Sequence, residues 1–127
     1  MPGKYLFEYA VIRVVPRVER EEFLNVGVVL FCAKLKFLKI LFKVDAQRLH
    51  IFCESIEAEE IKKYLIAFEK ICRGDDDAGP IAKLPAAERF RWLTATRSTV
   101  VQPSKVHPGF CDDADERLEK LFKQLVN

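Results

Sequence analysis

The sequence lacks the features that would carry a chain into or across a membrane. Its longest uninterrupted apolar stretch covers residues 26–33, far fewer than the ~18 residues that a membrane-spanning helix needs. The apolar run of residues 5–15 is broken by Glu8 and Arg13, and no small-residue cleavage site of a secretory leader follows it. We therefore expect no membrane association and a cytoplasmic location.

The sequence also lacks the cysteine spacings of redox or zinc motifs. It contains no Cys-x-x-Cys pair, so we expect reduced thiols. Two histidines and two cysteines form the spacings His-x-x-Cys and His-x-x-x-Cys, which are poor matches to ordinary zinc sites. We therefore predict no metal and no cofactor. The four cysteines are Cys32, Cys53, Cys72 and Cys111.

A strong charge of one sign is absent as well. The 21 basic and 19 acidic residues leave a formal net charge of +2, which gives no global case for nucleic acid as a partner. The length of 127 residues is typical of one domain, which we place at residues 1–127. Half of the residues are hydrophobic and 31% are charged, the balance of an ordinary globular protein.

What the sequence does contain is a readable order of strands and helices. Residues 5–15, 25–33 and 36–44 are rich in aromatic and β-branched side chains and predict three strands, joined by short links into an antiparallel meander. The first link, residues 17–22, is highly charged. Helices are predicted over residues 45–53, 55–73 and 85–93, a fourth strand over 96–102, and a last helix from Asp113.

This order predicts an α+β fold with an antiparallel or mixed four-stranded sheet and helices mainly on one face. The late strand is expected to lie beside the first or the third strand, and the sequence does not choose between them. Asp45 and Ser55 are predicted helix caps, and Gly74 is a predicted helix end. Gly27, inside the second strand, predicts a bulge or a close backbone approach.

One polar stretch, residues 89–109, stands apart. It holds the only Trp, three arginines, several hydroxyls and His107. Arginine presents a planar fork of donors that suits carboxylate or phosphate, so this stretch is a candidate anion site. The structural alternative makes Phe90 and Trp92 core residues and the arginines a solvated helix face. The candidate anion ligands are Arg89, Arg91, Arg97, Ser98 and Thr99.

His107 is the one histidine of this stretch, and histidine is the residue type suited to acid–base chemistry near neutral pH. Because it precedes Pro108, it is expected in an extended backbone at a turn. Ser98 and His107 are candidates for a nucleophile and a base, but no Gly-x-Ser-x-Gly elbow accompanies them.

Arg13 is the second unusual residue, because it lies in an otherwise apolar strand. A buried charge must be paired, and Glu22 or Glu8 is the expected partner in a structural salt bridge. The functional alternative places Arg13 beside Arg97 in one anion site.

Several segments resemble a bacterial family catalogued as domain of unknown function 3037. These are residues 9–16 (YAVIRVVP), 22–29 (EFLNVGVV) and 92–103 (WLTATRSTVVQP), followed by His107-Pro-Gly. The resemblance implies no established activity. It implies a link to HipA-like kinases, and so an accessory role of the toxin–antitoxin type. The family's motif residues fall on Arg13, Glu22, Asn25, Gly27, Trp92, Arg97, Ser98, Gln102 and His107.

These observations predict a binding or accessory module, with a HipA-like kinase or another protein as a possible partner. Its surface is expected to hold an anionic group or a protein. The alternative is a small hydrolase or nuclease that uses His107 as general base and Arg97 as an anion clamp. The predicted binding residues are Arg13, Asn25, Arg97, Ser98, Gln102 and His107.

Overall fold

The computed structural model describes residues 3–17, 20–97 and 99–126. It has an α+β fold, as predicted, with one antiparallel sheet in the order β3-β2-β1-β4, and β5 also pairs with β1. The late strands therefore lie beside the first strand. The strands are β1 (Tyr5–Val14), β2 (Leu24–Cys32), β3 (Phe37–Phe42), β4 (Val101–Pro103) and β5 (His107–Cys111).

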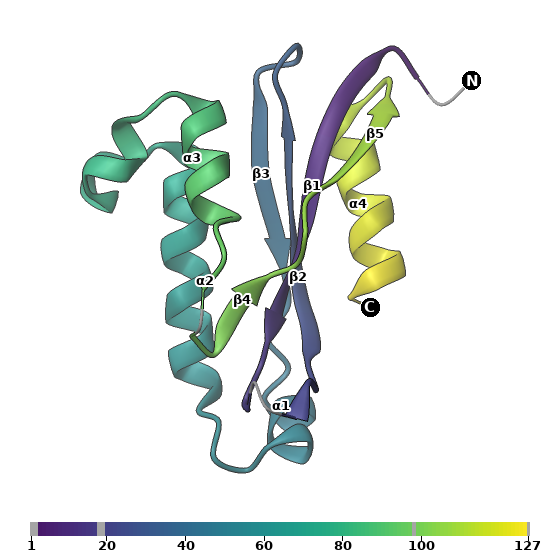
Figure 1. Cartoon of the computed structure of the whole chain (residues 1–127). Helices are drawn as coiled ribbons and strands as arrows, with labels where there is room; N and C mark the ends of the chain where they lie inside the picture. Colours follow the sequence, from purple (N-terminus) through teal and green to yellow (C-terminus); the bar gives the residue numbers. More distant parts are fainter. Residues whose placement is uncertain (1–2, 18–19, 98, 127) are drawn as a thin grey trace.

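Helices cover both faces of the sheet. Helices α2 and α3 pack on one face, α4 packs on the other, and α1 lies at one end of the sheet (Figure 1). Most of the helical residues lie on the α2–α3 side, as predicted. The helices are α1 (Ala46–Phe52), α2 (Ala58–Arg73), α3 (Ala86–Leu93) and α4 (Ala114–Leu125), with short 3-10 turns η2 (Asp76–Ala78) and η3 (Pro80–Lys83) between α2 and α3.

Each face of the sheet has its own apolar core, and β1 contributes to both. Ile12 and Val14 are fully buried on the α2–α3 face, whereas Phe7 is buried on the α4 face. Successive side chains of a strand point to opposite faces, so the odd-numbered positions of β1 face α4. Arg13 follows this alternation and lies on the α4 side.

The predicted fourth strand is shorter than expected, and the predicted turn at His107 is a fifth strand. Strand β4 pairs with Ile12–Val14, whereas β5 pairs with Tyr5–Tyr9 along the same edge of β1. Ser104 joins the two strands. Its hydroxyl accepts a hydrogen bond from the Val11 amide (2.8 Å), and its own amide donates to the Val11 carbonyl (2.7 Å). The hydroxyl thus takes the place of a main-chain carbonyl acceptor at the point where the neighbour of β1 changes from β4 to β5.

Local signals in the sequence account for most of the helix ends. The Asp45 and Asp113 side chains cap α1 and α4, and Gly74 ends α2 with a φ of 72°. The predicted cap at Ser55 is wrong, because α2 begins only after Glu57. Gly27 lies beside a register shift between β1 and β2, and a Cβ there would lie 2.9 Å from the Leu41 carbonyl oxygen. Both parts of the Gly27 prediction are confirmed.

Candidate functional site

Three of the six predicted binding residues form one row across the sheet. Arg13 on β1 lies directly opposite Asn25 on β2 and Gln102 on β4. Residues opposite each other in antiparallel strands project from the same face. The row therefore lies on the α4 side, at the end of the sheet where β1 runs into the β1–β2 connection.

The row is held largely by contacts within the chain. The Asn25 side-chain amide donates to the Leu125 carbonyl at the end of α4 (3.0 Å), and the Gln102 amide donates to the Thr99 carbonyl (2.8 Å). The Arg13 guanidinium lies 4.0 Å from the centre of the Phe23 ring. Among the described residues, Arg13 Nε and Asn25 Oδ1 are buried without a hydrogen-bond partner.

Arg97 lies on the opposite side of the sheet from this row. Its guanidinium donates to the carbonyls of Leu93 (2.8 Å) and Trp92 (2.6 Å), where α3 ends. It also lies over the rings of Trp92 and Phe68, at 4.6 and 5.1 Å from their centres. Burial against α2 and α3 lowers the pKa of Arg97 from its ordinary value. The side chain predicted to clamp an anion is thus directed at the carbonyl end of a helix.

Arg89 has a similar structural role at the end of α2. Its Nη1 donates to the carbonyls of Ile71 (2.9 Å) and Cys72 (2.8 Å), and its Nε donates to the Leu84 carbonyl (2.9 Å). Cationic donors at a helix C-terminus satisfy carbonyls that have no partner within the helix. Two of the three arginines of the polar stretch therefore fasten helices to the fold.

His107 lies apart from the other candidates. It is exposed on β5, opposite Tyr9, with ring centres 5.3 Å apart. It shares the α4 side with Arg13, but the positions of Tyr9 and Arg13 are four residues apart on β1, which is about 13 Å along a strand. Its other predicted partner, Ser98, lies outside the described residues.

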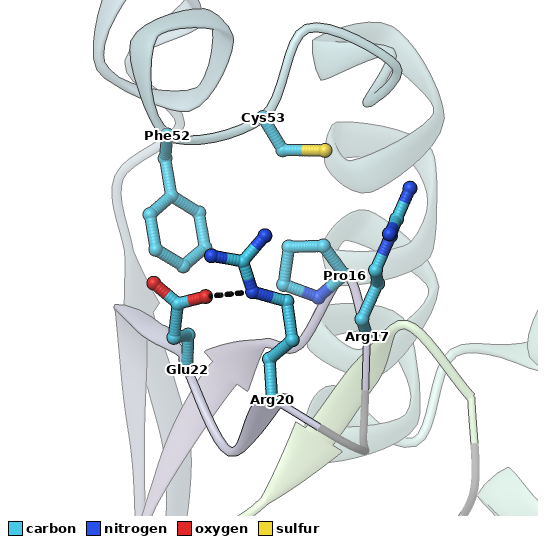
Figure 2. A pocket seen from close by; sticks show the side chains of 6 residues that line it. All are labelled: Pro16, Arg17, Arg20, Glu22, Phe52 and Cys53. Atoms are coloured by element: carbon cyan, nitrogen blue, oxygen red, sulfur yellow. Dashed lines mark ion pairs between the residues drawn. The ribbon is translucent and has the colours of Figure 1, made fainter.

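A pocket that the sequence interpretation missed lies at the end of the sheet. Described residues of the β1–β2 connection and the end of α1 line a half-open cavity of about 150 Å³. Figure 2 shows Arg17 and Arg20 extending from the connection toward the Cys53 thiol, with Pro16 between them. The lining residues are Pro16, Arg17, Arg20, Glu22, Phe52 and Cys53.

The pocket carries an excess of positive charge. Arg20 Nε pairs with Glu22 at 2.6 Å. In the part of the chain that the structure describes, Arg13 forms no ion pair with either predicted partner, Glu22 or Glu8, so the predicted salt bridge is wrong. Of the described lining residues, Arg17 and Arg20 supply two positive charges and Glu22 one negative charge, which leaves one positive charge. Among the described residues, Arg17 forms no ion pair with a carboxylate.

Cys53 differs from the other cysteines in its surroundings. Its Sγ lies 3.1 Å from the Ser55 hydroxyl, and hydrogen bonds from Ser55, helped by the charge of Arg17, lower the pKa of the thiol. By contrast, burial raises the pKa of Cys72 to about 12 and also raises that of Cys111. A thiolate therefore forms more readily at Cys53 than at these two buried positions.

A larger opening of about 370 Å³ lies between α2 and β4, but its chemistry is different. Apolar side chains such as Ile61 and Val100 line much of it, and its charged residues are Glu57 and Glu60. Carboxylates at the rim disfavour an anion there. The pocket with positive charge is the smaller one.

The row, the pocket and Cys53 all lie in a part of the chain that matches a known protein family. The family described as "Protein of unknown function (DUF3037)" matches residues 9–126, which include the row, the pocket and Cys53. The chain belongs to the DUF3037 family. No curated protein and no solved structure matches this DUF3037 chain significantly.

Within residues 3–17, 20–97 and 99–126, no helix is both long and apolar enough to cross a membrane. The same residues contain no group of three or more His, Cys, Asp or Glu side chains arranged to hold a metal ion.

Proposed function

We propose that this DUF3037 chain is a binding module that takes a small anionic group in the pocket between Arg17, Arg20 and Cys53. The observation that supports the proposal is that the described residues lining this pocket include two guanidinium groups and one carboxylate. Guanidinium binds carboxylate and phosphate oxygens with paired donors, so an anion complements this charge.

The size of the pocket limits what it holds. At about 150 Å³ it is smaller than the ~300 Å³ at which drug-sized ligand pockets begin. A phosphate or carboxylate group is of suitable size. We therefore propose that the ligand is a small anion, or a larger molecule that inserts only its anionic end.

The proposal moves the anion site away from the polar stretch where the sequence suggested it. The donors of Arg97 and Arg89 already bond to main-chain carbonyls, so binding an anion there requires breaking helix caps. The hydrolase or nuclease based on His107 stays a prediction, as does the link to a HipA-like kinase. Co-purification of the chain with such a kinase from the native host would test that link.

Thermal unfolding tests anion binding directly. We expect phosphate, compared with chloride at the same ionic strength, to raise Tm of the wild type more than that of Arg17→Gln or Arg20→Gln. At ten times Kd, mass action gives about 1.4 kcal/mol of stabilisation, or roughly 4–7 °C for a chain of this size. Arg91→Gln, an exposed change on α3, is the matched control and should behave as the wild type. An equal phosphate effect in all four proteins, as general salt stabilisation would give, contradicts the proposal.

A further inference from the structure

The cavity that carries the positive charge also presents a nucleophile. Cys53 lines its wall, and the thiol is only partly buried. The other three cysteines, Cys32, Cys72 and Cys111, are buried in the two cores. A solvent-borne reagent that enters the cavity therefore meets one thiol of the four.

The surroundings of Cys53 favour its reactive form. The thiolate is the nucleophile of cysteine chemistry, and hydrogen-bond donors and nearby positive charge stabilise it. Ser55 Oγ lies 3.1 Å from Sγ, and Arg17 and Arg20 line the same cavity. Two recognition elements thus meet at one place: a stabilised sulfur, and guanidinium donors for an anionic group.

We propose that Cys53 is a site of thiol–disulfide exchange with small anionic disulfides, whose carboxylates Arg17 and Arg20 hold. This inference rests on the anion-binding function proposed above and deepens it, because it names the class of molecule. Small disulfides of this class carry carboxylates a few bonds from sulfur, so one molecule engages both the guanidinium groups and the thiol.

The exchange is balanced without another reactant. Cys53 loses its proton to solvent, and the thiolate attacks one sulfur of the disulfide. A new bond forms between Cys53 Sγ and that sulfur while the original S–S bond breaks. The second sulfur leaves with the electron pair as a thiolate and takes up a proton from solvent. Cys53 is oxidised to the mixed disulfide, and the leaving half of the reagent is reduced to a thiol.

The buried positions of the other cysteines determine the fate of the product. Cys32, Cys72 and Cys111 are buried at 0%, 6% and 1% exposure, so none of the three is available to resolve the mixed disulfide without local unfolding. The adduct therefore persists until an external thiol removes it. While present, it leaves its own anionic group beside Arg17 and Arg20, where it blocks further anion binding.

Two aromatic disulfides of different charge test the inference. One is 5,5′-dithiobis(2-nitrobenzoate), which carries two carboxylates, and the other is neutral 2,2′-dithiodipyridine. We expect one fast-reacting thiol per native chain with the anionic reagent, mapped to Cys53 by peptide mass spectrometry and abolished in Cys53→Ser. The quantity measured is the ratio of the two rate constants, anionic over neutral. A substitution that changes the thiolate fraction of Cys53 changes both rate constants by the same factor, so it leaves the ratio unchanged.

We expect Arg17→Gln and Arg20→Gln each to lower this ratio roughly two- to fivefold at low salt, because each removes one charge from a solvent-connected site. Arg91→Gln should leave the ratio unchanged. An unchanged ratio in both pocket variants, or fast labelling at a cysteine other than Cys53, overturns the inference.

The two proposals fail in different ways. If phosphate stabilises the wild type selectively but the ratio does not respond to the arginines, anion binding stands and disulfide recognition is wrong. If phosphate has no selective effect on Tm and does not slow the anionic reagent, the anion site itself is wrong.

Discussion

Replacing Arg97 by alanine distinguishes a helix cap from an anion clamp. The guanidinium donates to the Leu93 and Trp92 carbonyls at 2.8 and 2.6 Å and lies 4.6 Å from the centre of the Trp92 ring. Each hydrogen bond from a partly exposed charged donor contributes about 1 kcal/mol, below the range for buried charged pairs. The ring contact adds ~0.5 kcal/mol. We therefore expect Arg97→Ala to lower the free energy of unfolding by roughly 2–3 kcal/mol.

The measurement is urea unfolding followed by circular dichroism. Arg97→Lys is the informative companion, because lysine keeps the charge near the helix end but cannot place two planar donors on two carbonyls while stacking on the ring. We expect it to recover about half of the loss. Arg91→Ala, on the exposed side of the same helix, should change the free energy of unfolding by less than ~0.5 kcal/mol. A loss below ~0.5 kcal/mol for Arg97→Ala would show that the cap does not hold α3, and would refute this reasoning.

Three further substitutions test other parts of the fold. Ser104→Ala removes the acceptor of the Val11 amide and should cost about 1–3 kcal/mol in urea unfolding, since a buried donor is left unpaired. Gly27→Ala brings a Cβ to 2.9 Å from the Leu41 carbonyl oxygen and should cost ~1–3 kcal/mol by overpacking. Cys72→Ala should remove an alkaline loss of stability. Folded Cys72 keeps its proton to about 12, whereas the unfolded thiol loses it at 9.0, so the wild type loses about 1.4 kcal/mol more than the variant between pH 8 and pH 10.

For each of these three substitutions, one measured result would contradict the expected change in stability. A neutral Ser104→Ala would mean that the edge of β1 closes without the hydroxyl. Unchanged stability of Gly27→Ala would mean that the β2–β3 contact relaxes freely. Burial raises the pKa of Cys72 on folding, so the unfolded chain loses this proton at a lower pH than the folded chain. The contribution of Cys72 to the free energy of unfolding is therefore fully present below pH 9.0 and is lost as the pH rises toward 12. Parallel pH curves for wild type and Cys72→Ala would therefore contradict burial of a neutral thiol there.

Local patterns in the sequence predict most of the fold because they act over a few residues. The three meander strands, the Asp45 and Asp113 caps and the Gly74 helix end all follow from neighbours along the chain. The sequence does not predict β5, because His107-Pro-Gly has the composition of a turn. Ser104 continues the hydrogen bonding to β1 across the break between β4 and β5.

The candidate site was harder to predict because it depends on register and on distant segments. The sequence predicts that Arg13, Asn25 and Gln102 share one surface, but not that they form a row. The row follows from the register in which β2 and β4 pair with β1. The sequence predicts Arg97 as an anion ligand because guanidinium donors suit free anions and the neutral carbonyls of a helix end alike. The pocket was missed because Arg17 and Cys53 are far apart in the sequence, and no spacing links the β1–β2 connection to the end of α1.

The most direct test of the account is an NMR titration that observes the Nε–Hε groups of the arginines in the wild-type chain. Phosphate is added against chloride at constant ionic strength. We predict saturable shifts for Arg17 and Arg20 with a common midpoint, and no saturable shift for Arg97, whose donors are held by α3. Equal, unsaturable drifts at Arg17, Arg20 and the exposed Arg91, or a saturable response at Arg97 alone, would contradict an anion site at the end of the sheet.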